Sequence, residues 1–286
     1  MASELHKPGQ LYIVGTPIGN LEDITLRAVR ILKEADLIAA EDTRVCRKLL
    51  SRYEISTPVT SFHEHSPSEK LRGLIANLKS GKVIALVSDA GMPAISDPGE
   101  KLVAAAIAEG IEVIPIPGPS AAITALAISG LPTAEFTFIG FLPRRQKERQ
   151  RALGDLAALT HTLVFYEAPH RLVAALEDLF KVLGNRRAVA ARELTKKFEQ
   201  IVRGELSEIT EHFKANPPRG EITLVVAGLA KPASVEKQSS RSEIPPVALS
   251  SAKAMMKRGI SAKDAAREIA AAMGVSRRLL YNALQR

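Results

Sequence analysis

The chain has 286 residues, 46% of them hydrophobic, which is enough for two or three domains with buried cores. No apolar segment at the start resembles a signal peptide, no run is long enough to cross a membrane, and the single cysteine, Cys46, excludes an intrachain disulfide. We therefore expect a cytoplasmic protein without membrane contact. Of the net charge of +8, residues 251–286 carry +6, from eight basic and two acidic residues, and this concentration predicts a polyanionic partner, most simply nucleic acid.

The first part of the chain alternates short apolar runs with segments of helical spacing. This alternation predicts an α/β domain over residues 1–120, with a mostly parallel sheet and helices on both of its faces. The expected strands are 11–15, 36–40, 58–63, 83–87 and 111–115, and the expected helices are 25–35, 44–53, 67–79 and 98–110; a further helix, 121–128, opens the next domain.

The pattern restarts near residue 133 and predicts a second α/β domain over residues 121–230. Its short strand-to-strand spacings favour a sheet of mixed direction. The expected strands are 135–140, 162–166, 187–192, 199–204 and 221–227, and the expected helices are 149–159, 171–183 and 207–215.

The C-terminal part is predicted to be a linker followed by a small helical domain. Residues 231–250 are rich in Pro, Ser and Lys, which is typical of a linker. Residues 251–286 show three short helical patterns (251–258, 262–273 and 277–285), and their spacing resembles a helix-turn-helix. Arg277 and Arg278 begin the last helix, where such modules contact nucleic acid; a packing or dimerisation module is the alternative.

Motifs for other cofactors are weak. The turn Gly15–Asn20 follows a strand but lacks the G-x-G-x-x-G pattern, and Pro17 removes an amide that a pyrophosphate would use. No P-loop motif is present, and the histidines do not have the spacing of a metal site, so we expect no metal.

The stretch Ser88–Gly99 follows the buried strand 83–87 and combines glycines, prolines and two aspartates. A long loop at the carboxyl end of a parallel strand is where open α/β sheets bind ligands. The alternative is a surface loop closed by aspartate side chains.

Taken together, an ordered set of short motifs resembles the ribosomal RNA small-subunit methyltransferase I family, within the tetrapyrrole methylase superfamily. The motifs are Gly15–Asn20, Glu41–Arg44, Phe62–His65, Ser88–Gly99, Pro117–Ala121, Gly140–Arg144, Tyr166–Arg171, Arg192–Lys197 and Gly220–Ile222. The resemblance covers residues 9–286 and implies a homodimer that binds S-adenosylmethionine in a cleft between two α/β domains. It also implies 2′-O-methylation of a cytidine in the decoding region of 16S rRNA, within the 30S subunit.

The resemblance assigns donor contacts to three loops of the first domain and one strand of the second. These residues are Thr16, Pro17, Ile18, Gly19, Asp89, Ala90, Gly91, Met92, Ile95, Ser120, Ala121, Tyr166 and Glu167. Met92 departs from the small polar residue that is usual in the family's loop.

A ribose hydroxyl is a weak acid, so a base within hydrogen-bond reach would assist the transfer. The candidates are Asp42, His63 and Glu64. Asp42 follows the second strand, as an acidic residue does in the superfamily. It could instead pair with Arg44 or cap the next helix, and Glu64 could pair with a neighbour.

Basic residues at two places are candidates for contact with RNA phosphates. Arg144, Arg145, Lys147 and Arg149 lie at the start of an expected helix, and Lys196 and Lys197 follow a strand. For the first group the alternative is an ordinary solvated helix start. A methylase of this fold acting on a small acceptor, or a non-enzymatic RNA-binding factor, remain the alternatives for the whole chain.

Overall fold

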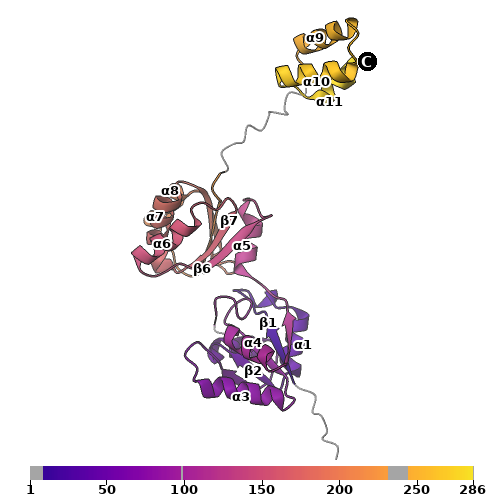
Figure 1. The fold of residues 1–286 in the computed structure, drawn as a ribbon. Helices are drawn as coiled ribbons and strands as arrows, with labels where there is room; N and C mark the ends of the chain where they lie inside the picture. Colours follow the sequence, from indigo (N-terminus) through magenta and orange to yellow (C-terminus); the bar gives the residue numbers. More distant parts are fainter. Residues whose placement is uncertain (1–8, 98, 231–243, 286) are drawn as a thin grey trace, which may run out of the picture. The chain divides into compact units, whose positions relative to one another are not determined.

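The computed structural model describes residues 9–97, 99–230 and 244–285. Two compact units are present: residues up to Leu229 form the first and residues from Ala230 form the second. The first unit contains two five-stranded sheets, and the regular structure in the described part of the second is helical (Figure 1).

The first sheet is entirely parallel, with the strand order β3-β2-β4-β1-β5. Its strands are β1 (Gln10–Val14), β2 (Leu37–Ala40), β3 (Val59–Ser61), β4 (Ile84–Val87) and β5 (Glu112–Ile116). The prediction of a parallel sheet is therefore confirmed. All of its strands end at the same edge, so the loops that follow β1, β2, β4 and β5 lie together there.

Helices cover both faces of this sheet, each with a separate aliphatic core (Figure 1). Helices α1 (Leu26–Glu34) and α2 (Thr43–Arg52) pack on one face through Leu32 and Leu50. Helices α3 (Ser68–Lys79) and α4 (Gly99–Ala108) pack on the other through Leu78 and Leu102. A 3₁₀ turn, η1 (Leu21–Asp23), precedes α1.

The second sheet is mixed, as predicted, with the strand order β6-β7-β10-β8-β9. The pair β6–β7 is parallel and the other pairs are antiparallel. The strands are β6 (Phe136–Phe141), β7 (Thr162–Glu167), β8 (Arg187–Arg192), β9 (Gln200–Glu205) and β10 (Ile222–Val226).

Four helices and a 3₁₀ turn accompany this sheet. Helices α6 (Gln146–Leu156), α7 (Leu172–Leu183) and α8 (Leu206–Ala215) share one core with Phe165, and η2 (Pro169–Arg171) leads into α7. Helix α5 (Ala121–Ser129) packs on the opposite face, against Val164 and Val225. Helix α6 lies earlier than the expected 149–159, because Arg145 already has the extended backbone of an N-cap and Gln146 begins the helix.

The second unit consists of α9 (Pro246–Lys257), α10 (Ala262–Met273) and α11 (Arg277–Leu284), packed around Ala252, Ala266 and Leu280. Ser261 and Ser276 cap α10 and α11. Helix α9 begins earlier than the expected residue 251, because proline is well tolerated in the first turn of a helix. Most of the expected linker, residues 231–243, lies outside the described residues. No described helix has the length and apolar character needed to cross a membrane.

Candidate active site

The loops that follow β1 and β5 touch each other through their backbones. A Cβ atom placed on Gly15 would lie 2.6 Å from Cα of Gly118. Only glycine permits this approach, since any side chain at either position would overlap the opposite main chain. The two glycines therefore fix the distance between the loops at the edge of the sheet.

The loops after β1 and β4 are joined by main-chain hydrogen bonds. The amide of Thr16 donates to the carbonyl of Gly91 at 2.9 Å, and the amide of Gly91 donates to the carbonyl of Thr16 at 3.1 Å. The buried hydroxyl of Thr16 also donates to the carbonyl of Ser88 at 3.1 Å. The turn and the loop that the sequence singled out thus form one continuous piece of backbone.

The loop after β4 is closed by one of its own aspartates. The carboxylate of Asp97 accepts hydrogen bonds from the amides of Ala94 at 2.7 Å and Gly99 at 2.8 Å. Ala94 and Ser96 have φ values of 69° and 60°, a region that residues other than glycine rarely adopt. Strained backbone of this kind is typical of ligand-binding loops, and Asp97 has a structural role in it. Pro98 lies outside the described residues.

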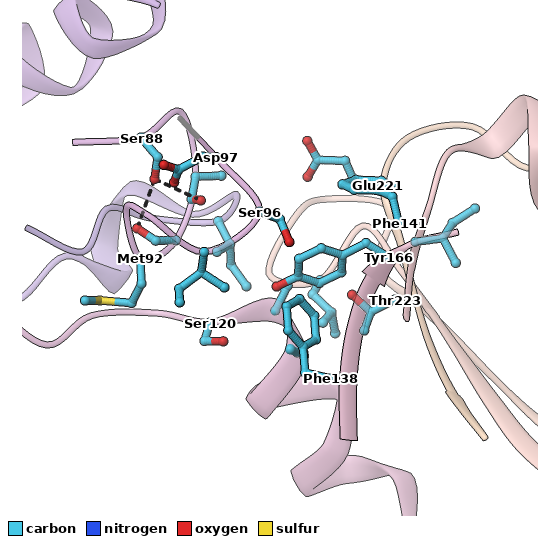
Figure 2. A pocket seen from close by; sticks show the side chains of 18 of the residues that line it. Ser88, Met92, Ser96, Asp97, Ser120, Phe138, Phe141, Tyr166, Glu221 and Thr223 are labelled. Carbon is cyan, nitrogen blue, oxygen red and sulfur yellow. Dashed lines mark hydrogen bonds between the residues drawn. The ribbon is translucent and has the colours of Figure 1, made fainter. Parts of the chain in front are cut away.

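A cavity of about 690 Å³ lies between this loop and the second sheet. Figure 2 shows Met92 and Ser120 on the side of the first sheet, and Phe138, Tyr166 and Thr223 on the side of the second. Of the predicted donor-binding residues, the cavity is lined by Ile18, Asp89, Ala90, Gly91, Met92, Ile95, Ser120, Ala121, Tyr166 and Glu167. The structure thus brings together residues from four separate segments of the sequence.

The remaining predicted donor-binding residues, Thr16, Pro17 and Gly19, line a neighbouring cavity of about 330 Å³. The two cavities share Ile18 and the Ser88–Ala90 segment. Cys46 also lines the smaller cavity, and burial raises the pKa of its thiol to about 11, which agrees with a packed rather than a nucleophilic cysteine.

The carboxylate of Glu167 contacts residues of the second sheet's own segment, not of the first sheet. That group is fully buried, lies 3.3 Å from Nε of Arg171 and accepts a hydrogen bond from the amide of Ala168 at 2.8 Å. Burial raises the pKa of Glu167 in spite of these partners. Its carboxylate is therefore held by Ala168 and Arg171 at the end of β7.

Asp42 both caps α2 and pairs with Arg44, the two structural roles given above as alternatives to a catalytic role. Its carboxylate caps α2 by accepting from the amide of Arg44 at 2.8 Å, and it pairs with the guanidinium of the same residue at 2.6 Å. These hydrogen bonds lower the pKa of Asp42 to about 2, so the carboxylate is a weak base. Asp42 is absent from the described lining of either cavity.

His63 and Glu64 are exposed in the loop after β3. The loop is closed by His63 and Ser66, since the amide of His63 donates to the Ser66 hydroxyl at 2.8 Å. Neither residue contributes to the described lining of the two cavities. Within the described ranges, no group of three His, Cys, Asp or Glu side chains has the arrangement of a metal site.

Glu41 is the carboxylate after β2 that does line the larger cavity. Its Oε2 lies 3.4 Å from the amide of Asp89, and the Asp89 carboxylate accepts from the amide of Asp42 at 2.9 Å. Burial raises the pKa of Glu41, and the neighbouring charge of Asp89 raises it further. Burial likewise raises the pKa of Asp89.

The predicted phosphate contacts fall into three different settings. Arg144 and Arg145 are exposed between β6 and α6, Lys147 is exposed in the first turn of α6, and Arg277 and Arg278 are exposed at the start of α11. The prediction for Arg149 is wrong, because this residue is buried and pairs with Asp178 at 2.6 Å. Lys196 likewise pairs with Glu193 at 2.9 Å and Glu221 at 3.0 Å, so its charge is already neutralised. Lys197 lies over the ring of Phe198, at 5.7 Å from the centroid.

Several cavity residues escaped the sequence analysis: Glu41 as a lining carboxylate, and Phe136, Phe138, Phe141, Glu221 and Thr223. Glu41 is the neighbour of Asp42, the candidate base, in the motif Glu41–Arg44. The phenylalanines carried a usable signal, because three of the eight in the chain fall within residues 136–141.

The sequence model for tetrapyrrole (corrin/porphyrin) methylases matches residues 10–210. Ribosomal RNA small subunit methyltransferase I of Halalkalibacterium halodurans is 49% identical over 274 residues, covering 96% of this chain and 94% of that protein. The protein of the same name from Thermotoga maritima is 50% identical over 220 residues, covering 77% of this chain and 99% of that protein.

Solved structures of lower identity share the fold. A diphthine synthase superposes with a TM-score of 0.60 at 17% identity, covering 77% of this chain and 90% of its own. Uroporphyrin-III C-methyltransferase of Thermus thermophilus, solved with S-adenosyl homocysteine, superposes with a TM-score of 0.54 at 22% identity. The match covers 77% of this chain and 97% of that chain. The chain thus belongs to the tetrapyrrole methylase family and, within it, to the ribosomal RNA small subunit methyltransferase I proteins.

Proposed function

We propose that this chain transfers the methyl group of S-adenosylmethionine to the ribose 2′-oxygen of a cytidine in the decoding region of 16S rRNA. The observation that carries the proposal is the 49% identity, over 96% of the chain, to a ribosomal RNA small subunit methyltransferase I. The large cavity supports it, since it joins the predicted donor-binding segments at one place.

The cavity has the size and chemistry that a methyl donor needs. Its volume of about 690 Å³ is within the range of small-molecule sites. S-adenosylmethionine supplies an activated methyl group on a cationic sulfur, and the acidic residues Glu41 and Asp89 line the same cavity. Ring faces such as that of Tyr166 also favour a cation. The predicted donor contacts from Thr16 to Glu167 are retained in the proposal.

The transfer forms a bond between the methyl carbon and the 2′-oxygen as the carbon–sulfur bond breaks, and the hydroxyl proton must leave. Glu41 is placed to accept that proton, because it lines the cavity and its raised pKa makes it a better base than a free carboxylate. Asp42, the first choice from the sequence, has a pKa of about 2 and holds α2 instead. His63 and Glu64 remain candidates only if the RNA draws their loop toward the cavity.

We further propose that RNA phosphates contact Arg144, Arg145 and Lys147, and that the C-terminal helices α9–α11 form an RNA-binding domain through Arg277 and Arg278. The exposure of all five side chains supports this role. Lys197 belongs to the same set, whereas the two ion pairs of Lys196 make it a structural residue. We propose that the chain is divided into an α/β domain over residues 1–120, a second α/β domain over 121–230, a linker that ends at α9, and the RNA-binding domain of α9–α11. The family resemblance supports a cytoplasmic homodimer that acts on the 30S subunit.

The decisive experiment is methyl transfer from tritiated S-adenosylmethionine to 30S subunits that lack this modification, followed by mass-spectrometric mapping of the labelled nucleotide. We expect one 2′-O-methylcytidine in the decoding region. Free 16S rRNA, a tetrapyrrole and a diphthine precursor are tested in parallel. Incorporation into a small acceptor without incorporation into RNA would contradict the proposal, and donor binding without transfer to any of them would favour a non-enzymatic RNA-binding factor.

A further inference from the structure

Strand β6 contains an irregularity that determines which way its aromatic side chains point. Phe138 is opposite Val164 and Phe141 is opposite Tyr166, so three steps along β6 correspond to two along β7. The register shifts between Phe138 and Gly140, so Ile139 is the extra residue, and Gly140 next to it has a φ of +73°. Without the bulge, Phe138 and Phe141 would lie on opposite faces of the sheet; with it, they share one face.

This shared face is the aromatic wall of the large cavity, which we define as Phe138, Phe141 and Tyr166 (Figure 2). The ring centroids of Phe138 and Tyr166 are 5.0 Å apart, and those of Phe141 and Tyr166 are 5.6 Å apart. The inner members are partly buried, but Phe141 is 55% exposed. Phe141 thus offers a ring to the cavity that the protein leaves largely uncovered.

Gly140, the residue before Phe141, also lies against the loop that follows β4. A Cβ atom on Gly140 would lie 2.9 Å from the hydroxyl oxygen of Ser96, a residue with a strained backbone in the loop after β4. The bulge and that loop therefore touch. Phe141 lies directly beside this contact, and the exposed residues Arg144 and Arg145 follow it in the chain.

We propose that Phe141 stacks on the pyrimidine base of the target cytidine and holds the nucleotide out of the RNA stack in the cavity. This inference rests on the proposed function. Single-stranded bases are recognised by stacking on exposed aromatic rings beside basic residues. Phe141, with Arg144 and Arg145 just beyond it, provides this combination at the edge of the cavity.

The test compares Phe141→Ala, Phe141→Leu and Phe141→Trp with the wild-type chain. Methyl transfer to unmodified 30S subunits gives kcat and KM, and isothermal titration gives the Kd of S-adenosylmethionine. Phe180→Ala is the matched control, because Phe180 is 44% exposed on α7 and lies outside the described cavity lining.

For Phe141→Ala we expect kcat/KM to fall roughly 5- to 150-fold, which corresponds to the ~1–3 kcal/mol that one base–aromatic stack contributes. Phe141→Trp should restore most of the activity and Phe141→Leu should not, because leucine replaces the apolar area but not the ring. The Kd of the donor and the activity of Phe180→Ala should stay within twofold of wild type.

Two results would overturn the inference. A donor Kd that rises as much as kcat/KM falls would show that Phe141 stacks on the donor, and equal activity of the alanine and leucine variants to wild type would show that no base stacks there. Both results are interpreted by comparison with a wild-type chain that methylates 30S subunits. If the wild type transfers no methyl group to RNA, it is the proposed function that fails, and the two failures are thereby distinguished.

Discussion

Arg149 and Asp178 form a buried ion pair that holds the start of the basic segment. Nη2 of Arg149 lies 2.6 Å from Oδ2 of Asp178, and the two side chains are 5% and 3% exposed. Gln146 and Gln150 donate to the other carboxylate oxygen at 3.2 and 2.6 Å. The same guanidinium donates to the backbone carbonyl of Arg144 at 3.2 Å, so this pair positions a residue that we assign to RNA contact.

Removal of one partner should therefore destabilise the protein strongly. For Asp178→Ala we expect the free energy of unfolding to fall by about 3–5 kcal/mol, because the Arg149 charge is left buried without a partner. Urea denaturation at pH 7 measures the loss. Glu69→Ala is the control: it removes an ion pair with Arg72 in which both side chains are 71% exposed, and should cost less than about 1 kcal/mol.

The ion pair also predicts a pH dependence. Burial raises the pKa of Asp178, but the hydrogen bonds from Gln150, Arg149 and Gln146 outweigh it, so its pKa is below the ordinary value of 3.8. Because its pKa is lowered, the ionised Asp178 stabilises the folded state at pH values above 3.8. This stabilisation is lost as the pH falls through the lowered pKa. The stability difference between wild type and Asp178→Asn should thus shrink below about pH 4. A difference that is constant down to pH 2 would contradict the ion pair.

Glu41 and Asp42 provide a direct test of which carboxylate takes the proton. Glu41→Gln should lower kcat at least about 100-fold, the typical contribution of a general base, with little change in the Kd of S-adenosylmethionine. Asp42→Ala should mainly lower the thermal stability, because alanine cannot cap α2. Single-turnover methyl transfer and thermal unfolding separate the two effects. The opposite pattern, with kcat lost in Asp42→Ala alone, would return the role to Asp42.

Glu41 should also respond to pH in the opposite sense to Asp178. Its folded pKa is raised above 4.5 by burial and by the charge of Asp89. Ionisation of Glu41 therefore opposes folding as the pH rises through that raised pKa. We expect Glu41→Gln to be at least as stable as wild type at pH 7, and the advantage to disappear below about pH 4.5. Thermal unfolding at several pH values measures this, and a less stable variant at pH 7 would contradict it.

Gly118 should tolerate no side chain. A Cβ atom there would lie 2.7 Å from Cα of Gly15, so Gly118→Ala must push apart the loops after β1 and β5 and lower both stability and donor affinity. Gly73→Ala is the matched control, because open space surrounds its Cβ position within α3. That change should increase stability by up to ~1 kcal/mol through helix propensity. Similar effects of the two substitutions would argue against the close approach.

Lys196 and Lys197 are neighbours with different predicted effects on RNA binding. Lys197→Ala should lower the affinity for 16S rRNA and reduce the slope of log K against log salt by ~1, as expected for one lost phosphate contact. Lys196→Ala should leave the slope almost unchanged, since that ammonium group is held by Glu193 and Glu221. Filter binding across a range of KCl concentrations measures both slopes, and a larger change for Lys196→Ala would reverse the assignment.

Much of the fold follows from local sequence signals. Apolar runs such as Ile84–Val87 predict buried strands, and Ser120, Ser261 and Ser276 mark helix starts that the structure confirms. The predicted start of α9 is wrong, because Pro245 and Pro246 are typical of a linker but proline also fits the first turn of a helix.

The candidate site was less predictable, because it depends on contacts between distant segments. The motif Glu41–Arg44 indicated a carboxylate after β2, but only the structure shows that Asp42 turns to Arg44 while Glu41 faces the cavity. In the same way, alternation along β6 assigns Phe138 and Phe141 to opposite faces, and no local signal announced the bulge at Gly140. Side-chain direction after an irregular turn or bulge is decided by packing, not by sequence spacing.

The link between Thr16 and Gly91 uses main-chain atoms alone, so exchanging the side chain of Thr16 leaves both of its backbone hydrogen bonds in place. One side of the cavity is thus a property of the chain's path, whereas the opposite side consists of exchangeable rings on β6 and β7. The two halves of the site are free to evolve at different rates. Replacements among the rings on β6 and β7 therefore alter the cavity without breaking the main-chain link that holds its other side.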